Sequence, residues 1–245
     1  MSTAAAATVS AMSLAGPAEL TRDAVAFWRR QLSEFPGDLE GWLGDRVSEV
    51  QFLWGHVVRM NGSQGMWKEL TESLEERDPT NAWTRHYDGI YFESQVLHIT
   101  RLVRAGQRTA AEQHPSSLGL LLRAFATRQE LLGPITGPFA AESLNVHADP
   151  LADLGQLEQM ISDLMDLRNR AVAHIDIGEP VPSIEWDDLE EATEAVTSTF
   201  ERYSLRLTGV NYKVRYEDTP WRDWQSVFRE PLFKVRLGLD ASELE

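Results

Sequence analysis

The strongest constraint on the fold is a run of apolar residues that return every three or four positions after Pro150. Its members are Leu154, Leu157, Met160, Ile161, Leu164 and Leu167. This spacing places the side chains on one face of an α-helix and does not fit the alternation of a β-strand. A helix of this kind must bury its apolar face, so its partners must come from other parts of the chain.

The same period recurs along most of the sequence and predicts those partners. Four core helices are expected near residues 81–106, 116–132, 150–175 and 186–207. Ser116–Ser117 supplies an N-cap for the second of them, and Gly209 ends the last. Upstream, the pattern predicts a helix from Glu19 to Phe35 and another that begins at Asp38. Asn61–Gly62 is predicted to end this helix, and Met66 to Arg77 then forms a shorter helix or a cap.

These elements predict an all-α protein, an up-and-down helical bundle with extra N-terminal helices. The expected organisation is a disordered tail (1–18), N-terminal helices that pack on the bundle (19–79), the bundle itself (80–209) and a C-terminal extension (210–245). In that extension Tyr212, Val214 and Tyr216 alternate, which is compatible with a short strand.

Composition limits the classes of function. The formal net charge of -15 repels a polyanion over most of the surface, which counts against a nucleic-acid ligand. A strip from Arg101 to Arg128 is nevertheless locally basic, with Glu112 as its single acid. That strip is compatible with a phosphate ligand and equally with two solvated faces of opposite sign.

Several site classes are missing from the sequence. The chain has no cysteine, which excludes disulfides and thiolate zinc sites and fits a reducing compartment. We find no HExxH, no phosphate-binding glycine loop and no GxSxG elbow, so neither a metal nor another cofactor is expected. The N-terminal run does not look like a secretory signal and no segment is apolar enough to span a bilayer. A cytoplasmic protein without membrane contact is therefore expected.

The most informative polar group follows the apolar run, in the string LRNRAVAHID at residues 167–176. It brings Arg168, Asn169, Arg170 and His174 to one helix end. The Arg-to-His spacing alone is ordinary, because a chain of this composition gives roughly one such match by chance. A second match, Arg108 to His114, falls in a loop and is interpreted as accidental. On a straight helix His174 pairs with Arg170, whereas Arg168 lies about 120° away around the axis. Cations that cap the last carbonyls of a helix are the structural alternative.

This string resembles the RNxxxAHxD form of the HEPN-domain signature, in particular that of abortive-infection-type HEPN proteins. The segment at residues 91–103, followed by Ser117–Leu118 and Leu121–Leu122, is similar to the second conserved block of that group. The resemblance covers roughly residues 80–207. It implies a HEPN-type bundle that forms a homodimer. It also implies metal-independent endoribonuclease activity, in a toxin–antitoxin or antiphage-defence role; other family members only bind.

The resemblance assigns the arginine role to Arg168, that of its polar neighbour to Asn169 and the histidine role to His174. RNA carries its own nucleophile, the 2′-hydroxyl, so a histidine that moves protons and an arginine that stabilises the phosphorane suffice. Arg170, Arg101 and His98 are further candidates for substrate binding, although His98 could equally be a half-buried, hydrogen-bonded residue. The implied partners are RNA, a second copy and an antitoxin or regulatory protein. Asp176 stands where one branch carries a modified tyrosine, so that branch's regulation is not implied. The alternative function is a non-catalytic helical interaction or scaffold protein.

Overall fold

The computed structural model of the chain describes residues 8–9, 16–75, 82–104, 117–135, 144, 146–169, 184–212 and 214–218. These residues are mostly helical, which confirms the all-α expectation. The α-helices are α1 (Pro17–Gln31), α2 (Leu39–Glu75), α3 (Ala82–Val103), α4 (Leu118–Ala126), α5 (Pro150–Met160), α6 (Ser162–Leu167) and α7 (Trp186–Thr208). The 3₁₀ turns Gln129–Leu131 and Tyr216–Asp218 and the two-residue strands β1 (Thr8–Val9) and β2 (Asn211–Tyr212) complete the described elements.

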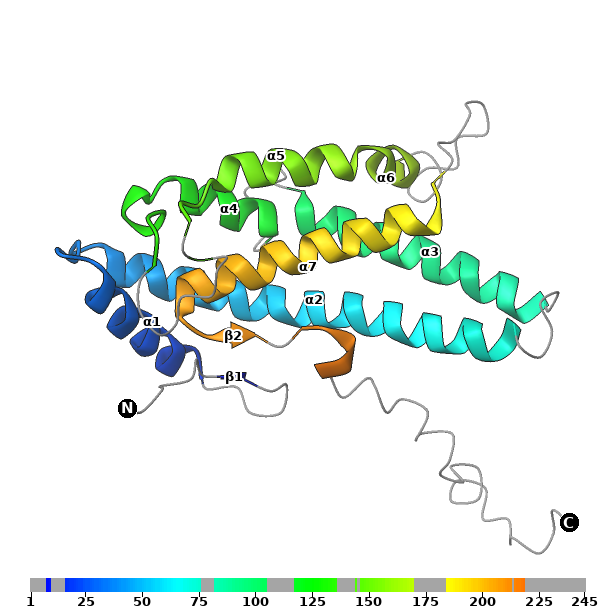
Figure 1. The fold of residues 1–245 in the computed structure, drawn as a ribbon, viewed down its shortest axis with the longest axis horizontal. Helices are drawn as coiled ribbons and strands as arrows, with labels where there is room; N and C mark the ends of the chain where they lie inside the picture. The colour runs from blue at the N-terminus through cyan, green and yellow to red at the C-terminus, as the bar shows by residue number, and fades with distance from the viewer. Residues whose placement is uncertain are drawn as a thin grey trace, which may run out of the picture.

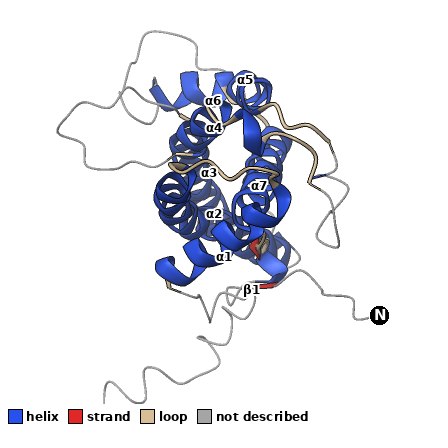
Figure 2. Cartoon of the chain, turned by 90° about the vertical axis from the view of Figure 1, so that its left-hand side faces the viewer, coloured by secondary structure: helices blue, strands red, loops and turns tan. Residues whose placement is uncertain are grey.

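The helices form an elongated bundle around one apolar core (Figure 1). Seen down the bundle, α4, α5 and α6 lie on one side, α3 and α7 in the middle, and α2 and α1 on the other side (Figure 2). The core draws residues from all of these helices, among them Trp28, Leu53, Ile99, Phe125 and Phe200. The HEPN-type arrangement remains an expectation.

Two of the four predicted core helices have the expected cap or end, and a third has a cap that was not predicted. The Ser117 hydroxyl accepts a hydrogen bond from the Leu120 amide at 3.2 Å and so caps α4. Glu185 and Asp188 form a capping box at the start of α7, and Gly209 ends this helix with φ 68°, in the left-handed region that favours glycine. The Asp149 carboxylate accepts from the Ala152 amide at 3.1 Å and caps α5.

The predicted end of a helix at Asn61–Gly62 is wrong, because α2 runs without interruption from Leu39 to Glu75. Of the separate element predicted from Met66 to Arg77, the described residues up to Glu75 belong to α2. Asn61 is buried, and its side-chain amide donates to Val57 O and to Thr197 Oγ1 of α7, each at 3.0 Å. Tertiary contacts with α7 thus outweigh the local preference of an Asn-Gly pair for a turn.

Two other predicted boundaries need correction. The helix expected over residues 150–175 breaks at Ile161, whose φ and ψ are -92° and 9°, and continues as α6. The helix expected to reach Phe35 ends at Gln31, because Leu32 is extended, although Leu32 and Phe35 still pack against the core. Leu32 and Phe35 thus follow the apolar spacing of the helix although they lie beyond its last residue.

A segment near the N-terminus pairs with the residues that follow α7. Thr8–Val9, within the segment predicted to be a disordered tail, pair in parallel with Asn211–Tyr212. The strand predicted at Tyr212, Val214 and Tyr216 is limited to its first position, since Tyr216 begins a 3₁₀ turn. Within the described ranges no helix is both long and apolar enough to cross a membrane.

Candidate functional site

Arg168 is positioned by α6, which packs on α3. Leu164 and Leu167 are buried, so α6 is held against the core and the backbone position of Arg168, the next residue, is fixed. Arg168 and Asn169 then form a π-helical turn, a wider turn that is frequent at functional sites. Arg168 is half-buried and Asn169 is exposed. The predicted motif therefore begins at a local distortion of the helix.

The Arg168 guanidinium has an unsatisfied donor. Its Nη1 atom is buried and has no hydrogen-bond partner among the described residues. A buried N–H without an acceptor is costly, and a guanidinium offers donors in a planar fork that fits a phosphate. Within this part of the chain, the Arg168 guanidinium therefore keeps a donor for which the structure supplies no acceptor.

His174 and Arg170 lie outside the described residues, so the pairing of His174 with either arginine stays a prediction. The chain enters and leaves this segment beside α3. On one side α6 packs on α3; on the other the Trp186 ring stacks on Trp67 of α2 at 4.7 Å and meets Phe92 of α3 edge-on at 5.1 Å. The described residues on both sides of positions 170–183 thus pack against α3.

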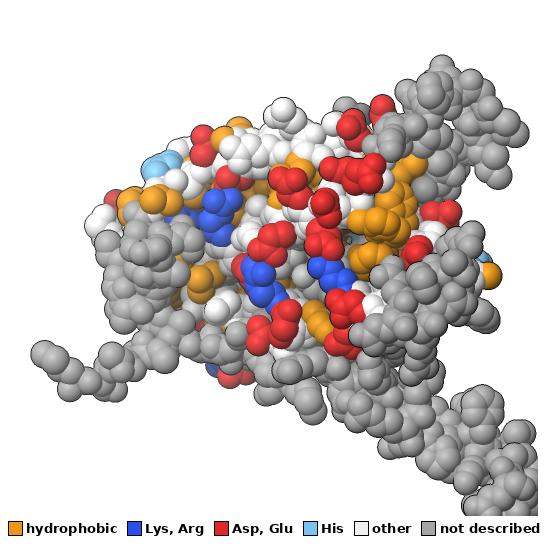
Figure 3. Space-filling view, turned by 45° about the vertical axis from the view of Figure 1, so that its right-hand side comes forward, with side chains coloured by type: hydrophobic (Ala, Val, Ile, Leu, Met, Phe, Trp, Pro, Cys, Tyr) orange, Lys and Arg blue, Asp and Glu red, His pale blue; other side chains and the backbone are white. Residues whose placement is uncertain are grey.

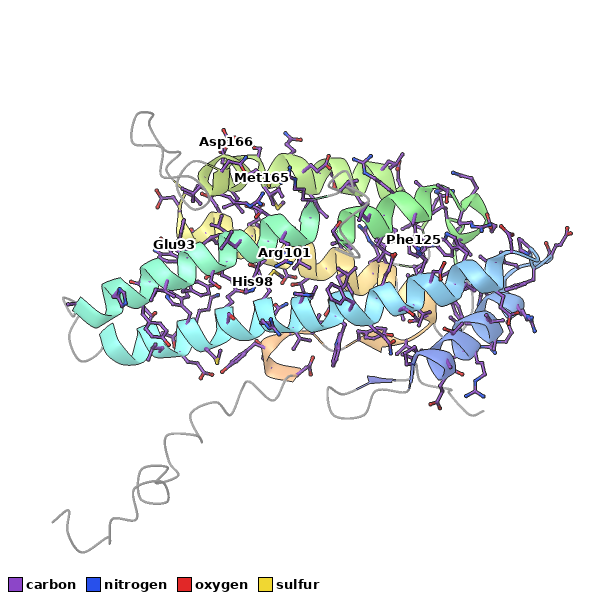
Figure 4. The ribbon with its side chains drawn as sticks, turned by 180° about the vertical axis from the view of Figure 1, so that it is seen from behind. Glu93, His98, Arg101, Phe125, Met165 and Asp166 are labelled. Carbon is purple, nitrogen blue, oxygen red and sulfur yellow. The ribbon has the colours of Figure 1, made fainter. Side chains whose placement is uncertain are left out.

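The other two candidates, His98 and Arg101, lie on α3 (Figure 4). Gln95 of α3 donates to Met60 O of α2 at 3.1 Å and sets the register of the two helices. This register brings His98 and Arg101 close to His56 and Arg59 of α2, whose charges act on His98. We call these four residues, His56, Arg59, His98 and Arg101, the α2–α3 basic cluster.

Sequence reasoning missed His56 and Arg59. Their spacing of three residues on a helix places them on one face, which was a usable signal. Their proximity to α3, however, depends on how two long helices align. Glu93, also labelled in Figure 4, is exposed on α3.

The two histidines of the cluster have lowered pKa values. Burial lowers the pKa of His98, and the positive groups Arg59, His56 and Arg101 lower it further. Burial also lowers the pKa of His56, with Arg59 and Arg101 acting in the same direction. His98 Nδ1 is buried and has no hydrogen-bond partner among the described residues. The hydrogen-bonded interpretation of His98 therefore does not hold for this nitrogen within that part of the chain.

In the described part of the chain, no group of three or more His, Asp or Glu side chains is arranged to hold a metal ion. The arrangement offers guanidinium and imidazole groups instead, which bind anions and transfer protons.

Comparison of the chain with protein-family models, with curated proteins and with solved structures found no match. The functional proposal therefore rests on the residues and on the geometry described above.

Proposed function

We propose that the protein is a metal-independent endoribonuclease of the HEPN type, acting as a toxin or in antiphage defence. The observation that carries the proposal is Arg168, whose guanidinium keeps a buried nitrogen without an acceptor among the described residues, at the start of an RNxxxAHxD string. Support comes from the helical bundle around it and from α3, against which the described residues on both sides of positions 170–183 pack.

The proposed reaction uses the RNA 2′-hydroxyl as nucleophile. His174 takes the proton of this hydroxyl, the 2′ oxygen forms a bond to phosphorus, and the bond from phosphorus to the 5′ oxygen breaks. The leaving 5′ oxygen takes up a proton from water and protonated His174 returns its proton to the solvent, so the products are a 2′,3′-cyclic phosphate and a 5′-hydroxyl. Arg168 stabilises the extra negative charge of the phosphorane, and Asn169 orients the scissile phosphate.

The test is cleavage of mixed-sequence single-stranded RNA in EDTA by the full chain. His174→Ala and Arg168→Ala should each lower the rate by about 100-fold or more, a typical loss for a proton-transfer or charge-stabilising group. Arg170→Ala should cost less, which decides between the two candidate arginines. His147→Ala is the matched control, because His147 is exposed in the segment that precedes α5.

Two further readouts make the test specific. Mass spectrometry should find the cyclic phosphate, and an oligonucleotide with 2′-deoxyribose at the cleaved position should resist cleavage. Equal cleavage by wild type and His174→Ala, or no cleavage by the folded wild type, contradicts the proposed mechanism.

A second candidate function is a non-catalytic helical module that assembles with other protein chains, a second copy included. The observation that favours it is a stripe of exposed apolar side chains on α3. Tyr87, Ile90 and Leu97 are 46%, 52% and 41% exposed and lie at helical spacing. A folded, dimeric protein that cleaves no RNA, and whose dimer is lost in Ile90→Asp, would favour this function over the nuclease.

A further inference from the structure

The α2–α3 basic cluster concentrates positive charge in an acidic protein. Figure 3 shows another face of the molecule, on which many acidic side chains gather with a few basic ones among them. In the cluster, by contrast, the charges that act on His56 and His98 are all positive. Like charges that gather on one surface repel, so an arrangement of this kind is stabilised when an anion binds.

The two arginines of the cluster are available to such an anion. Both are exposed, and neither makes an ion pair with the residues that the structure describes. Several other basic side chains do form ion pairs: Arg128 pairs with Asp38 at 2.7 Å, Lys68 with Glu190 at 2.8 Å and Arg202 with Asp153 at 2.8 Å.

Apolar surface lies beside these charges. Phe52 is 48% exposed, and its ring lies against the His56 imidazole with 4.6 Å between the ring centroids. Leu97 is 41% exposed and precedes His98 on α3. Arginines next to an exposed aromatic ring suit single-stranded nucleic acid, whose phosphates bind the cations and whose bases stack on the ring.

We propose that the α2–α3 basic cluster binds the backbone phosphates of single-stranded RNA, with Phe52 as a stacking surface for a base. This inference rests on the proposed nuclease function, because it identifies the part of the molecule that holds the substrate. The cluster shares α3 with the region on which α6 presents Arg168. RNA held along α3 is thereby kept close to the end of α6.

Binding is measured by fluorescence anisotropy of a labelled single-stranded RNA in EDTA, with all proteins carrying His174→Ala to keep the RNA intact. Arg59→Ala/Arg101→Ala should weaken binding by about 10-fold or more, and Phe52→Ala should weaken it as well. The slope of log affinity against log salt should become shallower, by about 0.7 for each lost phosphate contact.

The matched control is Arg22→Ala/Arg30→Ala, which removes the same charge from exposed positions on α1. This variant should bind RNA as the parent does. Circular dichroism checks that both double variants fold, which is expected because all four arginines are exposed.

Equal RNA affinity of the two double variants overturns the inference, and so does a parent protein that binds no RNA. The inference is also overturned if Arg59→Ala/Arg101→Ala binds RNA as the parent does but no longer binds poly-glutamate. That result would favour an acidic protein partner. The proposed function can fail on its own. If RNA binding depends on Arg59 and Arg101 but the wild type cleaves no RNA, the binding site stands and the nuclease function is excluded.

Discussion

At the scale of single residues, Arg206 is the clearest case of a side chain that the fold depends on. It lies on the apolar face of α7 and is fully buried. Its guanidinium donates to Leu131 O at 3.0 Å, Gly133 O at 2.7 Å and Val146 O at 3.0 Å. Burial lowers its pKa from the ordinary arginine value, yet the carbonyl dipoles accommodate the charge. One side chain thus joins the segment after α4 to the segment before α5.

Replacing Arg206 by methionine should therefore lower the free energy of unfolding by about 3 kcal/mol, because buried carbonyls lose a charged donor. Urea denaturation followed by circular dichroism measures this change. Arg123→Met is the control: its ion pair with Glu158, at 3.6 Å, is exposed, so its loss should cost less than about 1 kcal/mol. Equal costs for the two substitutions would mean that the carbonyl contacts of Arg206 contribute nothing.

At the scale of elements, α2 depends on a glycine that accommodates another segment. A Cβ atom at Gly65 would collide with the Tyr216 ring, which lies directly against this part of the helix. Gly55, in the same helix, has no atom within 4 Å of the corresponding position. Substitution of the two glycines should therefore change stability in opposite directions, although both lie inside α2.

Gly55→Ala should raise the free energy of unfolding by up to about 1 kcal/mol, because alanine is the better helix former. Gly65→Ala should lower it by about 1–3 kcal/mol, because Tyr216 must move. In a Tyr216→Ala background, Gly65→Ala should become stabilising, as Gly55→Ala is. Thermal denaturation of the four proteins and wild type checks these signs; a destabilising Gly65→Ala in the Tyr216→Ala background would contradict the close contact as the cause.

At the scale of the whole molecule, the burial of two histidines beside positive groups makes stability depend on pH. His56 and His98 have folded-state pKa values below the ordinary value of about 6.5. The charged groups that act on them are Arg59 of α2 and Arg101 of α3, together with His56 itself on His98. Between the folded-state pKa and 6.5 the unfolded chain thus binds more protons, so acidification favours unfolding.

The free energy of unfolding should therefore fall as the pH drops below about 6.5, and the fall should level off below the folded-state pKa values. The variant His56→Gln/His98→Gln should show a weaker decline between pH 8 and 5.5, a range that lies above the usual pKa of carboxylates. Urea midpoints at each pH measure the slopes. His86→Gln/His147→Gln replaces two exposed histidines and should retain the wild-type slope. Identical slopes in all three proteins would exclude the cluster as the source.

The sequence by itself determined the helical class, the helices of the bundle and several of their caps. These features depend on residues three or four positions apart, as Ser117 with Leu120 shows. It also identified Arg168, Asn169, His98 and Arg101 as polar positions on helical faces. It did not find the break at Ile161, because an apolar period continues through a single non-helical residue.

Tertiary structure alone decided the features that depend on distant residues. Asn61–Gly62 signals a turn locally, yet the hydrogen bond between Asn61 and Thr197, 136 residues further along the chain, holds this pair inside α2. Gly65 of the same helix likewise lies against the distant Tyr216. The same holds for His56 and Arg59, which become neighbours of His98 only through the register of α2 on α3. Apolar periodicity and helix caps depend on residues close together in the sequence. The alignment of two helices is set by packing along their whole length, so no short segment specifies it.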